Sequence, residues 1–383
     1  MKDELKQIEP GSRRALLDRV TQELSDLGTG SEETLGEQLL NLGVSRRSFM
    51  QFCAGIASMM AIPAAMVPKM AYALETAKPS VIYMSFQECT GCLESLVNSY
   101  TVSSAGSTTI ENLILKLISL DYQETLMAAA GTQAEEWRDQ VMAQNSGRFV
   151  LVVDGSVPKL PSDPNDPRNG YFVSGGKTGE LRFIEAASQA GLIIALGTCA
   201  AFGGLPNAHP NPTGAISIGE MMKLRGIDKP LINLSGCPPI AEVITGVIMY
   251  YLTYGTAPTL DRLKRPTVFY GGDAIHDECY RKDYYEKGMF ATSFDDAGAR
   301  QGYCLLKLGC KGPSTHNACS TLRWNARVSF PMKSGHGCLG CAEPYFWDGG
   351  QTTLTANPTP YWPNGPVKSA SFYSELPRSV IHD

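Results

Sequence analysis

The sequence lacks a surplus of positive charge. Its 33 Lys and Arg residues stand against 38 Asp and Glu residues, which gives a formal net charge of -5. A surface that follows nucleic-acid phosphates needs a basic excess, so we expect no nucleic-acid partner. The 43% of hydrophobic and 19% of charged residues exclude a disordered or collagen-like chain, and 383 residues are enough for two domains.

Long apolar runs are also scarce. The longest spans residues 52–68, about 17 residues interrupted by Gly and Pro, which is short for a transmembrane helix. It follows the pair Arg46-Arg47 and precedes a small-x-small motif at residues 71–73, an order typical of a twin-arginine export signal. We therefore expect residues 1–73 to be a signal peptide and the mature protein to be periplasmic; an uncleaved membrane anchor is the alternative.

Four continuous apolar runs follow, at residues 81–84, 149–153, 192–196 and 231–234. Runs without polar alternation are typical of strands buried on both faces of a sheet. Segments with helical spacing lie between or after them, at residues 110–120, 134–142, 180–190 and 241–254. This alternation predicts a parallel sheet with helices on both sides over residues 74–265.

Eleven cysteines are many for a large globular chain. Cys89, Cys92, Cys199 and Cys237 each follow one of the predicted strands. The carboxyl ends of parallel strands converge on one crevice, so we expect these four sulfurs to meet there. Four thiolates hold either a zinc ion or an iron-sulfur cluster. The glycines and prolines beside them let the backbone approach closely, which favours the bulkier cluster.

A second region begins near residue 266, where short polar segments replace the long apolar runs. Because it has little apolar material of its own, we expect inorganic cross-links to supply much of its stability. Its candidate ligands are His276, Cys279, Cys304, Cys310, Cys319, Cys338 and Cys341. Two other uses of the cysteines stay open: five disulfides among the ten mature cysteines of an exported binding protein, or structural zinc sites.

The cysteine motifs resemble those of one family. They are Glu88-Cys89-Thr90-Gly91-Cys92, Gly197-Thr198-Cys199, Gly236-Cys237-Pro238-Pro239, His276-x-x-Cys279, Cys304, Cys310-Lys311-Gly312-Pro313, Cys319 and Gly335-His336-Gly337-Cys338-x-x-Cys341. In this order they are similar to the small subunit of periplasmic and membrane-associated nickel-iron uptake hydrogenases. The cluster-bearing subunit of respiratory NADH:quinone oxidoreductase is a more distant alternative, since it carries one cluster and adjacent cysteines.

The resemblance implies three iron-sulfur clusters, each with its own ligands. The proximal 4Fe-4S cluster would be held by Cys89, Cys92, Cys199 and Cys237. The medial 3Fe-4S cluster would be held by Cys319, Cys338 and Cys341, with Pro331 where similar proteins have a fourth ligand. The distal 4Fe-4S cluster would be held by His276, Cys279, Cys304 and Cys310. The fold implied is a flavodoxin-like doubly wound sheet, then a small irregular cluster-binding domain over residues 266–350 and a polar tail over residues 351–383.

The resemblance also implies that catalysis and electron transfer are carried out by two different subunits. The nickel-iron centre that splits dihydrogen would lie in a separate large subunit, because the two C-x-x-C pairs here lack the flanking residues of nickel-binding motifs. This chain would carry electrons to an external acceptor such as a cytochrome or a membrane electron-transfer subunit. The carboxy-terminal segment is polar, so membrane attachment would need other subunits.

Two further expectations concern the proximal ligands. Glu88 adjoins Cys89 and is a candidate proton relay; the alternative is a solvated or helix-capping carboxylate. Oxygen-tolerant members of the family carry two extra cysteines near this cluster, and the matching positions here are Gly91 and Gly204. The resemblance therefore predicts an enzyme that oxygen inhibits.

Overall fold

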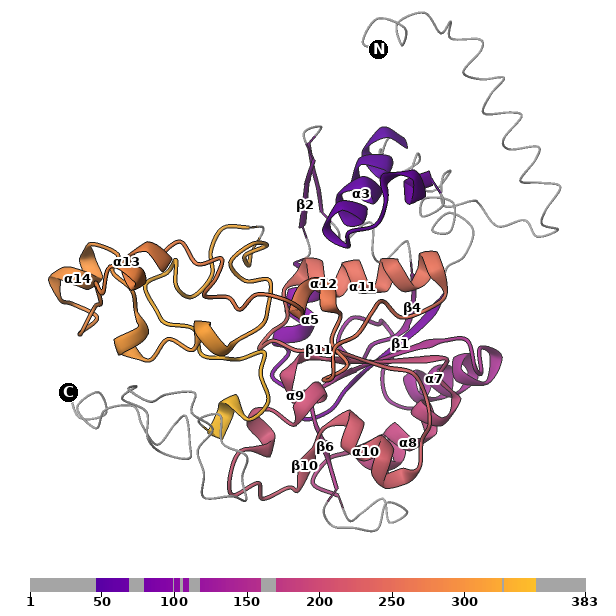
Figure 1. Cartoon of the computed structure of the whole chain (residues 1–383). Helices are drawn as coiled ribbons and strands as arrows, with labels where there is room; N and C mark the ends of the chain where they lie inside the picture. Colours follow the sequence, from indigo (N-terminus) through magenta and orange to yellow (C-terminus); the bar gives the residue numbers. More distant parts are fainter. Residues whose placement is uncertain are drawn as a thin grey trace, which may run out of the picture.

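The computed structural model describes residues 46–68, 79–98, 100–103, 106–109, 118–159, 170–325 and 327–348. A sheet with helices on both faces lies beside a second, irregular part that begins after about residue 265 (Figure 1). The predicted cleavage motif at residues 71–73 and the polar tail from residue 351 lie outside the described residues.

Five parallel strands form the sheet, in the order β11-β9-β5-β1-β4. They are β1 (Ser80–Ser85), β4 (Ser119–Tyr122), β5 (Val150–Asp154), β9 (Leu192–Leu196) and β11 (Leu231–Leu234). Counted along the chain from the β4 edge, the order is 2-1-3-4-5, the doubly wound order of flavodoxin. The predicted flavodoxin-like fold and its four predicted strands are confirmed.

The prediction of a helix over residues 110–120 is wrong at its carboxyl end. Ser119 and Leu120 belong to β4, while residues 110–117 lie outside the described part. Among the described residues β4 pairs with β1 alone, which makes it an edge strand, and it is only partly buried. Because an edge strand need not be apolar on both faces, it leaves no continuous apolar run in the sequence.

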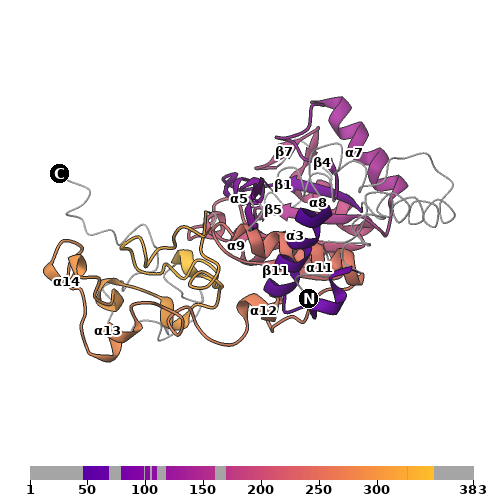
Figure 2. The same ribbon diagram turned by 90° about the horizontal axis from the view of Figure 1, so that it is seen from above.

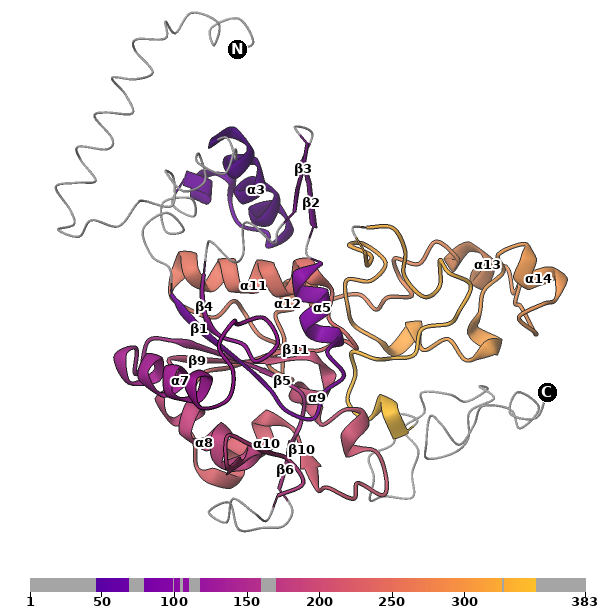
Figure 3. The same ribbon diagram turned by 180° about the vertical axis from the view of Figure 1, so that it is seen from behind.

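Helices cover the two faces of the sheet, because the strand residues alternate between two apolar clusters. Val81 and Tyr83 of β1 face one cluster, with α5 (Gly91–Val97) and α11 (Ala241–Tyr254); Ile82 and Met84 face the other. The second cluster is covered by α7 (Thr132–Gln144), α8 (Gly179–Gln189) and α10 (Ile218–Arg225). Figure 3 shows α11 and α10 on opposite sides of the sheet. The helices predicted over residues 134–142, 180–190 and 241–254 are confirmed.

Shorter elements connect this framework. They are β2 (Tyr100–Ser103) with β3 (Gly106–Thr109), β6 (Val157–Pro158) with β10 (Ala215–Ile216), β7 (Val173–Ser174) with β8 (Lys177–Thr178), α9 (Gly197–Phe202) and η3 (Leu205–Asn207). Of these, α9 directly follows β9 and carries one of the candidate ligands.

The second part is built from very short helices and loops (Figure 2). They are α12 (Thr267–Tyr270), α13 (Lys282–Glu286), α14 (Ala297–Arg300), η4 (Leu306–Leu308), η5 (Gly312–Ser314) and η6 (Phe346–Asp348). Several of its buried side chains, including Leu305, Phe330 and Met332, belong to the same apolar cluster as α11 and one face of the sheet. The second part thus shares a core with the first.

The amino-terminal described segment packs on the outside of α11. It consists of α3 (Arg46–Met59) and η2 (Ala64–Met66), and Figures 1 and 3 both place α3 on the side of α11 that faces away from the sheet. No helix in the described part of the chain is both long enough and apolar enough to cross a membrane. The signal-peptide assignment of residues 1–73 stays a prediction.

Candidate functional site

The first four candidate ligands lie at the carboxyl edge of the sheet. Cys89 follows β1, Cys92 lies in the first turn of α5, Cys199 lies in α9 after β9, and Cys237 follows β11. Cys92 is buried, Cys89 is exposed and the other two are half-buried. The predicted convergence is present, because the charge of each of these thiols acts on others in the group.

Burial and mutual repulsion oppose ionisation of these thiols. Burial raises the pKa of Cys199 to about 12 and that of Cys237 to about 11, and the neighbouring thiols add to both shifts. Burial also raises the pKa of Cys92 well above its ordinary value. Thiolates packed this closely need positive charge among them, and iron in a cluster would supply it. The donor set therefore fits an iron-sulfur cluster.

Glycines make room around these sulfurs. Gly197 has a φ of +85°, and a Cβ built on it would overlap the Cys92 Sγ. Gly204 has a φ of +61°, and its Cβ would lie 2.5 Å from the Cys199 Sγ. Both positions combine a left-handed backbone with close packing, so only glycine fits without strain. Gly91 differs, because its Cβ would stand 3.4 Å from the Cys89 Sγ in ordinary contact.

Two carboxylates lie near this first group. The fully buried Asp154, at the end of β5, accepts a hydrogen bond of 2.8 Å from the Tyr83 hydroxyl and interacts with the Cys92 thiol. Burial raises the pKa of Asp154 to about 6 and that of Glu88 to about 7. Glu88 also accepts a hydrogen bond from the backbone N–H of Thr90. Asp154 was not predicted as a site residue; its signal in the sequence is a lone carboxylate at the end of a buried apolar strand.

The next three candidate ligands, Cys319, Cys338 and Cys341, gather where the second part meets the sheet. Burial raises the pKa of Cys319 to about 12 and that of Cys338 to about 11, and the charges of Cys319 and Cys338 both act on Cys341. The Cys341 thiol also interacts with Cys237 of the first group. The second group therefore lies directly beside the first.

The remaining four candidate ligands are also close to one another. The backbone N–H of Cys279 donates to the His276 carbonyl over 3.1 Å, and that of His276 donates to the Gly312 carbonyl over 3.2 Å. Cys310 interacts electrostatically with Cys279 and with Cys304. The Cys338 N–H donates to the Cys310 Sγ over 3.2 Å, so the third group adjoins the second.

His276 has the properties of a neutral ligand. Burial lowers its pKa, and its ring packs edge-on against Tyr285 with 4.5 Å between the centroids. It is half-buried, whereas the thiols of Cys304 and Cys310 are buried. A neutral imidazole is the form that can bind a metal, and its partial exposure places this third group near the surface.

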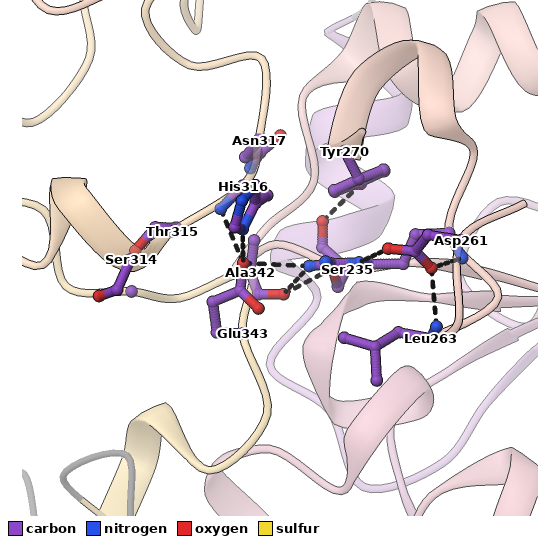
Figure 4. A network of polar contacts seen from close by, with 12 residues as sticks. Ser235, Asp261, Leu263, Tyr270, Ser314, Thr315, His316, Asn317, Ala342 and Glu343 are labelled. Atoms are coloured by element: carbon purple, nitrogen blue, oxygen red, sulfur yellow. Dashed lines mark hydrogen bonds and ion pairs between the residues drawn. The ribbon is translucent and has the colours of Figure 1, made fainter. Parts of the chain in front are cut away.

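A polar network fixes the second part against the sheet edge (Figure 4). Buried Arg265 contacts the Asp261 carboxylate at 2.9 Å, the Glu343 carboxylate at 3.2 Å and the Ala342 carbonyl at 3.1 Å. The Ser235 hydroxyl donates to the Ala342 carbonyl over 2.7 Å. These contacts hold the residues directly after Cys341.

A threonine completes the link between the two groups. The Thr198 hydroxyl donates to the Cys341 carbonyl over 2.5 Å and accepts from the Gly236 N–H over 2.8 Å. Thr198 precedes Cys199 and Gly236 precedes Cys237. One hydroxyl therefore ties the backbone at two ligands of the first group to a ligand of the second. No role was predicted for Thr198, because its partner is 143 residues away in the sequence.

The cysteines do not pair with one another. All eleven lie within the described residues, and no disulfide joins any of them. The alternative of five disulfides is therefore wrong for this structure. Among the described residues, no three His, Cys, Asp or Glu side chains lie close enough to hold one metal ion between them.

Comparison with family models separates the two parts of the chain. A model of the 20 kDa subunit of NADH ubiquinone oxidoreductase matches residues 89–251, over the sheet. A model of the carboxy-terminal region of NiFe and NiFeSe hydrogenase small subunits matches residues 270–354. The second match distinguishes the hydrogenase family from the respiratory alternative, because it covers the region with the additional cysteines.

Individual relatives agree over most of the chain. The Hydrogenase-1 small chain of Citrobacter freundii is 46% identical over 326 residues, 85% of this chain and 82% of the relative. The uptake hydrogenase small subunit of Azotobacter vinelandii is 44% identical over 321 residues, 83% of this chain and 84% of the relative. A structure of the recombinant [NiFeSe] hydrogenase from Desulfovibrio vulgaris Hildenborough matches with a TM-score of 0.63 and 32% identity, over 74% of this chain and 99% of that chain. The chain belongs to the family of nickel-iron hydrogenase small subunits, the electron-transfer subunits of an oxidoreductase whose nickel site lies elsewhere.

Proposed function

We propose that this small subunit carries electrons through three iron-sulfur clusters in the order of its three ligand groups. Cys89, Cys92, Cys199 and Cys237 would hold a proximal 4Fe-4S cluster; Cys319, Cys338 and Cys341 a medial 3Fe-4S cluster; and His276, Cys279, Cys304 and Cys310 a distal 4Fe-4S cluster. When bound, such clusters accept and donate single electrons.

The contacts between neighbouring groups carry this proposal. The first and second groups meet at Cys237 and Cys341, and the second and third meet at Cys338 and Cys310. These two contacts support an order in which the second group lies between the other two. A row of three sites is the arrangement that a stepwise electron path requires.

The protein residues set the properties of each site. Thr198 and Arg265 fix the second group against the first, which keeps the gap between them constant. His276 contributes a neutral ring in place of a thiolate, and one fewer negative charge tends to raise a cluster potential. Its position in the half-exposed third group makes that group the proposed exit for electrons.

The proposed partners lie at the two ends of this row. A hydrogenase large subunit with the nickel-iron centre would dock near the first group, and an external acceptor such as a cytochrome or a membrane electron-transfer subunit would dock near His276.

The protein would be exported by the twin-arginine route and act in the periplasm. Glu88, beside Cys89, would relay protons near the large subunit. Glycine at positions 91 and 204 would leave the proximal cluster with four ordinary thiolates and the enzyme sensitive to oxygen.

Iron analysis with matched cysteine variants tests the proposal. Anaerobically purified protein should contain about 11 irons per chain, from two 4Fe-4S clusters and one 3Fe-4S cluster. Cys319→Ala should lower the iron content and remove the paramagnetic signal of the oxidised medial cluster. All samples are the full-length, uncleaved chain, in which Cys53→Ala is the control: this buried cysteine lies outside all three groups, so its replacement should change neither quantity. Folded protein without iron, or equal iron loss in both variants, would refute the assignment.

A further inference from the structure

A buried arginine lies among the ligands of the third group. Arg281 follows Cys279 by two residues and is 6% exposed. Arginine is almost never fully buried in a folded protein unless a group of opposite charge is paired with it. Arg281 is therefore expected to have a negative partner.

The other buried arginines of the described chain have such a partner. Arg138, Arg182 and Arg265 each contact a glutamate carboxylate within 3.2 Å. Arg281 forms no ion pair with any carboxylate of the described residues. Its charge is therefore not compensated in the way that theirs is.

Uncharged oxygens hold the guanidinium of Arg281 in place. Its Nε donates to the Tyr280 hydroxyl over 2.8 Å and to the Met332 carbonyl over 3.0 Å. Its Nη1 donates to the Tyr303 carbonyl over 2.7 Å. Because Tyr303 directly precedes Cys304, this last contact also fixes the backbone beside a candidate ligand. These dipoles orient the guanidinium but do not cancel its unit charge.

The charge of Arg281 acts on the thiols of the third group. Its backbone N–H donates to the Cys279 Sγ over 3.5 Å. Burial raises the pKa of all three thiols, those of Cys279, Cys304 and Cys310. The guanidinium opposes this rise at each of them. One fixed positive charge therefore favours the ionised form of every thiol in the group.

We propose that Arg281 is the counter-ion of the distal cluster and raises its reduction potential. A cluster becomes more negative by one unit when it accepts an electron, so a fixed positive charge beside it stabilises the reduced form. This inference rests on the proposed function, because it takes the third group as the ligands of a 4Fe-4S cluster.

Arg281 and His276 would act in the same direction. The neutral imidazole removes one negative charge from the ligand set, and the guanidinium adds a positive charge beside it. Both make the distal site a better electron acceptor. Because Arg281 is buried, salt screens its charge much less than it screens a surface charge, so the effect should persist at high ionic strength.

A redox titration of the anaerobically purified heterodimer tests this, with the distal cluster followed by electron paramagnetic resonance. Arg281→Met removes the charge but keeps most of the apolar volume. It should shift the equilibrium toward the oxidised cluster at least about tenfold, which is about 59 mV for one electron. Arg281→Lys keeps the charge and should shift the equilibrium less than about threefold.

Arg300→Met is the matched control. Arg300 lies in the last turn of α14, in the same part of the chain, and is exposed. The substitution removes the same side chain, but water and salt already screen its charge. Arg300→Met should therefore shift the equilibrium less than about twofold.

The outcomes separate this inference from the proposed function. An unchanged potential in Arg281→Met would overturn it, as would a shift of equal size in Arg281→Lys or Arg300→Met. If Arg281→Met lacks the distal cluster, with about four irons fewer, Arg281→Lys decides. Full iron and a nearly unchanged potential in Arg281→Lys support the counter-ion, and loss of the same iron overturns it. A wild-type heterodimer without a distal cluster would overturn the proposed function itself, so iron is measured on every sample.

Discussion

Replacing Arg265 tests how the second part is held against the sheet. Its side chain is 5% exposed and lies between the carboxylates of Asp261 and Glu343, whose side chains are 18% and 11% exposed. Arg265→Met keeps most of the apolar volume but removes the one positive charge that contacts both carboxylates; Ala342 keeps the hydrogen bond from the Ser235 hydroxyl, Glu343 that from the His316 N–H and Asp261 that from the Leu263 N–H. Removing one partner from a buried charge network costs about 3–5 kcal/mol.

This cost should appear in both stability and cofactor content. For a chain of this size it corresponds to a loss of on the order of 10 °C in melting temperature. Because Ala342 and Glu343 directly follow Cys341, the variant should also lose iron from the medial site before the distal one. Anaerobic thermal unfolding, followed by circular dichroism, and iron analysis measure the two effects on the same sample.

A surface ion pair provides the control. Lys282 and Asp277 are 3.5 Å apart with side chains 38% and 41% exposed. Lys282→Met should therefore cost less than about 1 kcal/mol. If Arg265→Met is no more destabilising than Lys282→Met, or keeps its full iron content, then the network does not hold the second part in place and the reasoning is wrong.

Three other predictions concern the proximal site. Gly197→Ala should lose about four irons per chain, because the added Cβ overlaps the Cys92 Sγ. Gly176→Ala is the control: its φ is a similar +75°, and no atom lies within 4 Å of the added Cβ. This control should be destabilised only by the backbone strain, about 1–2 kcal/mol, and should keep its iron. Glu88→Gln should slow turnover with all clusters present; unchanged turnover would favour a solvated or capping carboxylate. The holoenzyme should lose dihydrogen oxidation in air, and sustained activity there would contradict the ordinary four-thiolate site.

Local sequence signals were sufficient for four of the five strands of the sheet and for placing the first four candidate ligands at its carboxyl edge. The strands β1, β5, β9 and β11 are buried on both faces, so each leaves a continuous apolar run. A residue that follows such a run lies at the carboxyl edge of the parallel sheet. Cys199 and Cys237 follow the neighbouring strands β9 and β11, so they lie close together. β4 was not predicted, because this partly buried edge strand has no continuous apolar run.

Contacts between distant segments were not predictable in the same way. Thr198 and Cys341 are 143 residues apart, and Arg265 and Glu343 are 78 residues apart. Nothing in the local pattern of either segment marks its partner, because the contact exists only after both parts have folded. Asp154 was missed for a related reason. A carboxylate at a strand end is common, and only the folded structure shows that this one contacts Tyr83 and Cys92.

The shared core of the two parts has a consequence for how the protein is made. Leu305, Phe330 and Met332 are buried in one cluster with α11 and the sheet, so part of the hydrophobic interior of residues 266–348 is shared with the first part. An isolated fragment of this region would expose those side chains and aggregate, even when supplied with iron and sulfide. The second and third ligand groups, which lie in this region, therefore depend on the sheet part for the burial of their surroundings.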